Sequence, residues 1–170
     1  MYPQLAEFDL ATPLHVSFYK LCTQNPLPFI PGAQGALAQA HTYHKTAIVT
    51  SSQRPSLEHL LHALPDPHTI DVTLCGDDCL RSKPDPEGYL KAAKKLEVDP
   101  KHCLVFEDSL AGLTAAKTAG MMRIAITHRP FHVDQARALS HFSIANYTEL
   151  PALFFKTIGL DNRSSSDSNR

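Results

Sequence analysis

Residues 103–121, with the sequence CLVFEDSLAGLTAAKTAGM, constrain the fold of this chain more than any other segment. Apolar residues of a predicted buried strand lead directly into Glu107 and Asp108, and a predicted helix begins at once behind a Ser-x-x-Gly turn. Open α/β sheets bind their ligands at the carboxyl ends of their strands. The two carboxylates are therefore predicted to lie at a ligand-binding edge of a parallel sheet.

The rest of the chain alternates between two kinds of pattern. Continuous apolar runs, typical of buried parallel strands, cover 46–50, 69–74, 103–106, 122–127 and, more weakly, 142–145. Helical patterns cover 33–40, 55–64, 86–96, 110–119 and 150–158. Pro31-Gly32 is expected to open the first helix, Ser56 to cap the second and Gly120 to close the fourth. This order predicts an α/β fold with right-handed crossovers and a doubly wound sheet.

Composition limits the function classes. The 170 residues are 43% apolar, which suits one domain with a real core. Sixteen basic residues against seventeen acidic ones give a net charge of −1, so neither nucleic acid nor an anionic membrane surface is an expected partner. The absence of a long apolar run, of a leader pattern and of a Cys-x-x-Cys pair predicts a soluble, cytoplasmic protein with reduced thiols.

Together with Ser82-Lys83-Pro84-Asp85-Pro86 and the preceding TAIVTSS strand at 46–52, the acidic pair resembles the haloacid dehalogenase (HAD) superfamily. The likeness is strongest to its β-phosphoglucomutase and sugar-phosphatase branch, and it runs over about 28–160. The resemblance implies a three-layer, Rossmann-like core with a parallel sheet. It also implies a Mg²⁺-dependent phosphatase or phosphomutase that acts on a small phosphorylated metabolite.

Glu107 and Asp108 are the candidate metal ligands. Mg²⁺ prefers oxygen ligands and is usually held by one or two carboxylates together with phosphate and water. From the residues alone, a second interpretation is equally good, in which the acids only complement the dipole of the following helix. The resemblance favours the metal site, with Asp108 as the more direct ligand.

Lys83, Thr50 and Ser51 are the candidate catalytic and phosphate-binding residues. Lys83 precedes a rigid Pro-Asp-Pro turn that can aim its ammonium at a phosphate or a carboxylate, whereas an isolated lysine would be a solvated surface charge. Thr50 and Ser51 follow the first strand and reach the same edge, although they could instead cap a helix. The resemblance implies that Thr50 and Lys83 contact the transferring phosphoryl group. Arg54 is expected to be a surface residue.

Other clusters are given structural interpretations. The histidine pairs His41/His44 and His59/His62 lie three residues apart on predicted helices but have no third ligand with zinc-like spacing. Asp77-Asp78 follows a glycine and is typical of a turn.

The nucleophile motif of the resembled family, Asp-x-Asp-Gly-Thr after an apolar strand, does not occur in the sequence. The nearest phrase is Phe8-Asp9-Leu10-Ala11-Thr12, in which Asp9 would be the nucleophile but Ala11 replaces the second acid. Without that central strand, we expect a gap in the sheet between the strands at 46–50 and 103–106, either open or filled by residues 5–10.

The expected organisation is a remnant of a helical cap segment at 1–25, an incomplete HAD-like core at 26–160 and a disordered tail at 161–170. The favoured function is a phosphatase or phosphomutase that is inactive as this chain stands, with Mg²⁺ binding weak or lost. The alternatives are a non-catalytic binding or regulatory protein that pairs with a full-length relative, and the product of a truncated gene.

Overall fold

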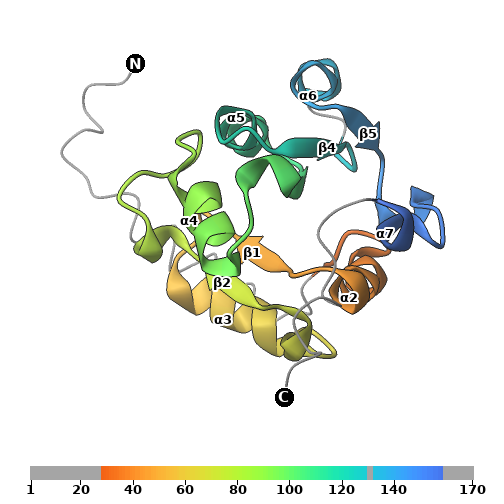
Figure 1. Ribbon diagram of the computed structural model, residues 1–170, viewed down its shortest axis with the longest axis horizontal. Coiled ribbons are helices and arrows are strands. Elements are labelled where there is room, and N and C mark those ends of the chain that lie inside the picture. The colour runs from red at the N-terminus through yellow and green to blue at the C-terminus, as the bar shows by residue number, and fades with distance from the viewer. Residues whose placement is uncertain (1–27, 130–131, 159–170) are drawn as a thin grey trace, which may run out of the picture.

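The protein is described by a computed structural model over residues 28–129 and 132–158. The expectations for 1–25 and 161–170, and for Asp9, lie outside the described residues. Helices and strands alternate along the chain, as Figure 1 shows, in the order α2 (Ala33–Tyr43), β1 (Ala47–Val49), α3 (Arg54–His62), β2 (Val72–Leu74), α4 (Glu87–Leu96), β3 (Leu104–Glu107), α5 (Leu110–Thr118), β4 (Met122–Ile126), α6 (Val133–Leu139), β5 (Phe142–Ile144) and α7 (Phe154–Thr157).

All five predicted strands are present, and every pairing between them is parallel. They form a two-stranded sheet, β1-β2, and a three-stranded sheet, β3-β4-β5, with Ala47 opposite Val72 and Glu107 opposite Ala125. Over the described ranges no ladder joins β1 to β3. The predicted gap between these two strands is therefore confirmed.

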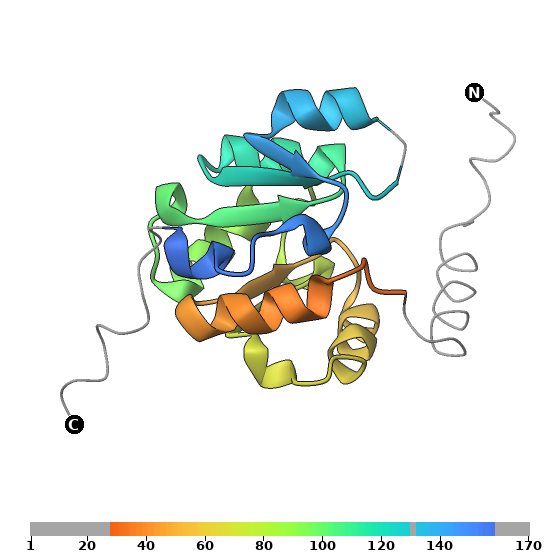
Figure 2. The ribbon, with the colours of Figure 1, turned by 90° about the vertical axis from the view of Figure 1, so that its right-hand side faces the viewer.

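The helices form layers on both sides of the strands. α4 packs against β1 and β2, and α5 and α6 pack against β3, β4 and β5. α2 and α7 pack on each other and cover the opposite face, in front of the strands in Figure 2. From β1 the strand order runs outward to β2, and from β3 it runs the other way to β5. The direction of winding thus reverses at the gap, which is where doubly wound sheets bind ligands.

The core lies mainly between α4, α5 and the three-stranded sheet. One cluster joins Tyr89 and Ala93 of α4 to Val105 and to the alanines of α5, and a second joins Leu113, Ala125 and Ala136. Small residues let α5 approach the sheet closely. This packing fixes the start of α5, directly behind Glu107 and Asp108, and hence the positions of both acids.

Three sequence expectations need correction. α6 was not predicted, because it has only seven residues and lacks a strong apolar pattern, and its N-cap residue, His132, has a left-handed conformation (φ 60°) rather than a typical capping side chain. The helix expected over 150–158 is confined to α7. Ser56 does not cap α3, because the helix starts earlier, with Gln53 as N-cap residue and a proline in its first turn.

The expected opening and closing glycines are confirmed: Gly32 is the N-cap residue of α2, and Gly120 follows α5 with φ 75°. Among the described helices, none has the length and hydropathy needed to cross a lipid bilayer.

Candidate functional site

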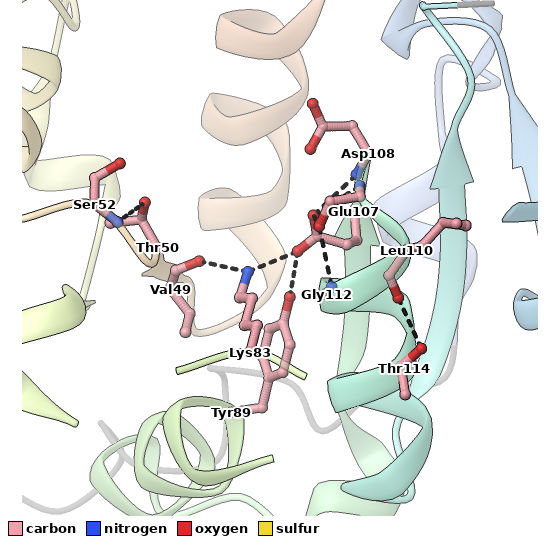
Figure 3. A network of polar contacts seen from close by, with 11 residues as sticks. Val49, Thr50, Ser52, Lys83, Tyr89, Glu107, Asp108, Leu110, Gly112 and Thr114 are labelled. Carbon is pink, nitrogen blue, oxygen red and sulfur yellow. Dashed lines mark hydrogen bonds and ion pairs between the residues drawn. The ribbon is translucent and has the colours of Figure 1, made fainter. Parts of the chain in front are cut away.

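Lys83 joins the carboxyl ends of the two sheets. Its ammonium donates to the Val49 carbonyl at the end of β1 (3.1 Å) and to Oε2 of Glu107 at the end of β3 (2.7 Å), as Figure 3 shows. The Lys83 and Glu107 side chains are only 14% and 8% exposed. The buried lysine thus links β1 to β3 through hydrogen bonds. Its backbone is restricted because it precedes Pro84, and this limits the direction in which its side chain extends.

Glu107 accepts five hydrogen bonds. Oε2 takes one from Lys83 and one from the Tyr89 hydroxyl (2.6 Å), while Oε1 takes those of the Ser109 hydroxyl (2.9 Å), the Ser109 amide (3.0 Å) and the Asp108 amide (3.1 Å). Burial raises the pKa of Glu107, but the Lys83 charge and the hydrogen bonds outweigh it and hold this pKa below its usual value. Glu107 is therefore a buried, ionised anchor.

The Ser-x-x-Gly turn makes room for this anchor. The Ser109 hydroxyl caps α5 by accepting from the Gly112 amide at 3.0 Å. A Cβ on Gly112 would overlap the Glu107 carboxylate. No role for Tyr89 or Gly112 was predicted from the sequence. Their only sequence signals are the tyrosine six residues after Lys83 and the glycine three residues after Ser109.

Asp108 has a different environment from its neighbour. It is exposed, and in Figure 3 its carboxylate extends away from Lys83. Although the residue is exposed, neighbouring protein atoms displace part of the water around its carboxylate, and this desolvation, together with the adjacent negative charge of Glu107, raises the pKa of Asp108. A carboxylate whose charge is disfavoured by a neighbouring carboxylate is well suited to accept a cation.

The predicted site residues Thr50, Ser51, Lys83, Glu107 and Asp108 all line one cavity of about 880 Å³ between the two sheets. Thr50 continues the β1 ladder through its amide, and its hydroxyl accepts from the Ser52 amide at 3.0 Å. Ser51 is exposed beside it. The structure thus brings hydroxyl groups, an ammonium and two carboxylates to the carboxyl edge of the strands.

Arg54, Asp77 and Asp78 form a separate cluster that joins two loops. The Arg54 guanidinium pairs with Asp78 at 2.5 Å, and its amide donates to Asp77 at 2.7 Å. Asp78 also accepts from the Cys75 amide at 2.8 Å, which helps to lower the pKa of Asp78. These contacts favour a structural role, because the charged groups pair with one another and with backbone amides of the two loops.

The histidine pairs do not combine into a metal site over the described ranges, where no group of three or more His, Cys, Asp or Glu side chains could hold an ion. His41 lies 3.9 Å from Asp71, and Nε2 of His44 lies 2.5 Å from the Phe155 carbonyl. The two residues of the first pair thus contact different parts of the fold.

Comparison with known proteins decides the family. The haloacid dehalogenase-like hydrolase family model matches residues 5–120. The chain belongs to the haloacid dehalogenase-like hydrolases. It is similar to the validoxylamine A 7'-phosphate phosphatase of Streptomyces hygroscopicus subsp. limoneus, with 36% identity in a 131-residue alignment that covers 73% of this chain and 61% of that protein. It is also similar to a phosphorylated carbohydrates phosphatase of Thermotoga maritima, with 43% identity over 55% of this chain and 44% of the relative.

Solved structures agree with this HAD-like assignment. A CbbY variant from Rhodobacter sphaeroides, in complex with xylulose-(1,5)bisphosphate, has a TM-score of 0.69 at 28% identity and matches 84% of this chain and 64% of its own. A β-phosphoglucomutase-like protein from Thermotoga maritima has a TM-score of 0.59 at 34% identity, over 67% of this chain and 54% of that one. The HAD-like chain thus spans about half to two thirds of the length of these relatives.

Proposed function

We propose that this HAD-like chain carries the phosphate-facing and metal-binding part of a phosphatase or phosphomutase site for a small phosphorylated sugar. The observation that carries the proposal is the convergence of Thr50, Ser51, Lys83, Glu107 and Asp108 on one cavity at the carboxyl edge of the strands. The named relatives that act on sugar phosphates support the substrate class.

Asp108 fits a Mg²⁺ ion better than Glu107 does. Mg²⁺ is held by one or two carboxylates plus phosphate and water, and its role when bound is to neutralise phosphate charge. Glu107 already accepts five protein donors, whereas Asp108 is exposed. We therefore assign Asp108 as the direct ligand and Glu107 as the group that positions Lys83. A single exposed carboxylate predicts weak Mg²⁺ affinity.

Lys83 and the two hydroxyl residues supply the phosphate-facing groups. Lys83 lines the cavity and donates to Glu107 and to the Val49 carbonyl, so one of the three donors of its ammonium is left for a phosphate oxygen. Thr50 and Ser51 add hydroxyl donors at the same edge. These groups bind and orient a phosphate but do not attack it.

Turnover needs an attacking group, and the sequence contains no Asp-x-Asp-Gly-Thr. We therefore propose that this 170-residue chain binds phosphate without Mg²⁺-dependent hydrolysis. The test is hydrolysis of p-nitrophenyl phosphate with and without Mg²⁺, beside the Asp108→Asn variant. Metal-dependent turnover that Asp108→Asn abolishes would contradict inactivity and point to Asp9 as the nucleophile.

Binding is measured separately, from amide shifts of Thr50 and Ser51 on titration with glucose 1-phosphate and Mg²⁺. Lys83→Met should weaken the phosphate-induced shifts at least about tenfold. Lys101→Met should leave them unchanged, because Lys101 pairs with Asp99 on the surface. Equal phosphate binding by both variants would show that Lys83 does not contribute to the phosphate site.

A second candidate is a non-catalytic protein that pairs with a full-length relative. The observation in its favour is that Lys83 and Glu107 are satisfied by the protein's own groups, so the site is stable without substrate. A folded product that binds no phosphate ester but associates with such a relative would favour this candidate.

A further inference from the structure

Tyr147 lines the same cavity as the site residues, and the proposed function gives it no role. It begins η5 (Tyr147–Glu149), the short 3₁₀ helix between β5 and α7. Its amide donates to the Pro31 carbonyl at 3.1 Å, and a Cβ added to Gly32 would lie 3.0 Å from the Tyr147 carbonyl carbon. Its ring packs on Phe106 of β3, with 5.4 Å between the ring centroids. The backbone and the ring of Tyr147 are therefore both held in place.

Asp108 and Tyr147 lie on the same side of β3. Successive side chains of a strand point to opposite faces. Glu107 points towards Tyr89 of α4, whereas Phe106 points the other way, towards Tyr147. Asp108 follows Glu107 directly, and in Figure 3 its carboxylate extends away from the Glu107 carboxylate. The carboxylate that the site offers to a cation thus extends to the side where Tyr147 lies.

The Tyr147 hydroxyl is half-buried and has no hydrogen-bond partner within the described ranges, whereas the Tyr89 hydroxyl donates to Glu107. Burial raises the pKa of Tyr147 to about 12, and of the two carboxylates that contribute, Asp108 has the larger effect and Glu107 the smaller. The hydroxyl is therefore protonated at pH 7, with one donor and two acceptor lone pairs. Buried polar groups are generally satisfied by protein, water or ligand, so this hydroxyl is suited to a partner that enters the cavity.

The chemistry of Asp108 defines that partner. An Mg²⁺ ion held by one carboxylate oxygen leaves the second oxygen and the metal-bound waters in need of hydrogen bonds. Glu107 is already occupied, because it accepts five hydrogen bonds from other groups. Groups that hydrogen-bond a ligating carboxylate fix its orientation, and their loss typically lowers metal affinity about 10–100-fold. Tyr147 has the hydroxyl, the location and the fixed backbone that this task requires.

We propose that Tyr147 is a positioning residue of the metal site, whose hydroxyl forms hydrogen bonds with the oxygen atoms of Asp108 and of the waters on a bound Mg²⁺. This role rests on the proposed assignment of Asp108 as the Mg²⁺ ligand. It makes the affinity of the site depend on η5 as well as on the acidic pair.

The test uses Mn²⁺ as a probe for Mg²⁺ on the full 170-residue chain, with free Mn²⁺ measured by electron paramagnetic resonance. Tyr147→Phe should raise the Kd at least about tenfold, because it removes the hydroxyl and keeps the ring on Phe106. Tyr43→Phe is the matched control and should leave the Kd unchanged, since Tyr43 ends α2 and is not among the described residues that line the cavity. Asp108→Asn should abolish binding.

A second measurement separates positioning of the metal site from a purely structural role. Tyrosine is labelled with carbon-13 at its phenol carbon, and the Tyr147 resonance is assigned from its loss in Tyr147→Phe. Addition of MgCl₂ should shift this resonance and leave that of Tyr43 unchanged. The shift should disappear in Asp108→Asn, which keeps Tyr147 but removes the ligand. Circular dichroism verifies that each variant is folded.

The outcomes distinguish the role of Tyr147 from that of Asp108. Equal Mn²⁺ affinity of Tyr147→Phe and the parent protein, with binding lost in Asp108→Asn, would overturn the role of Tyr147 and keep Asp108 as the ligand. No Mn²⁺ binding by the parent protein, or unchanged binding by Asp108→Asn, would overturn both assignments. Equal weakening by Tyr43→Phe would show that the effect is not specific to the hydroxyl in the cavity, which also contradicts the proposal.

Discussion

The Lys83 ammonium lies 2.7 Å from the Glu107 carboxylate, and both side chains are nearly inaccessible to water. This ion pair joins a loop that follows β2 to the end of β3. Its partners, Val49 and Tyr89, belong to β1 and α4. One charge pair therefore links elements of both sheets, and its loss should affect the fold as well as the site.

Replacing Lys83 by methionine should lower the free energy of unfolding by about 3 kcal/mol, because it leaves a buried carboxylate without its counter-charge. Urea denaturation measures the change. The double variant Lys83→Met/Glu107→Gln should recover part of the loss, since the uncompensated charge is removed. Lys101→Met, which breaks an exposed pair with Asp99, should cost less than about 1 kcal/mol.

Gly112→Ala should destabilise the protein by about 2 kcal/mol or more, because its Cβ would occupy the space of the Glu107 carboxylate. Helix propensity alone predicts the opposite sign. Gly35→Ala is the matched control, since Gly35 lies in α2 and a Cβ added there would meet nothing within 4 Å. That substitution should stabilise the protein by about 0.5–1 kcal/mol. Thermal unfolding of both variants separates packing from propensity.

Tyr89→Phe should cost about 1.5–3 kcal/mol, the typical value of a hydrogen bond to a charged group. The lost hydroxyl donates to Glu107 at 2.6 Å inside the core, while the ring that lies 4.8 Å from the Lys83 ammonium is kept. Tyr147→Phe is the comparison, because within the described ranges the Tyr147 hydroxyl has no hydrogen-bond partner. Equal unfolding free energies for the two variants would show that the Tyr89 hydroxyl contributes nothing specific.

The strands were predictable because each is a short, continuous apolar run, and such runs are typical of buried parallel strands. The gap was predictable from the missing strand. Convergence of the site residues on one edge followed from the places of Thr50 and the acidic pair at strand ends and of Lys83 before a rigid turn. α6 was not predictable, because its seven residues have a weak pattern and its position depends on packing against α5.

The sequence did not predict that Glu107 would be buried and Asp108 exposed. Adjacent residues at the end of a strand point in different directions, but which one is buried depends on the surrounding elements. Here the Glu107 side chain is buried because the Tyr89 hydroxyl of α4 donates to it and because Gly112 of α5, which has no Cβ, leaves room for its carboxylate. Both contacts join residues that are distant along the chain or separated by a turn, so no local pattern specifies them.

Acid should weaken the fold through Glu87. Its carboxylate accepts from Lys91 (2.6 Å) and from the Leu80 and Arg81 amides (2.9 and 3.0 Å), which lower its pKa to about 2. A folded-state pKa below the ordinary value of 4.5 means that the contribution is complete above about pH 4.5 and is lost as the pH falls towards 2. Glu87→Gln should therefore reduce stability at pH 7 and flatten its decline between pH 4.5 and 2. Urea midpoints measured across this range check the prediction, and parallel curves for the variant and the parent protein would contradict it.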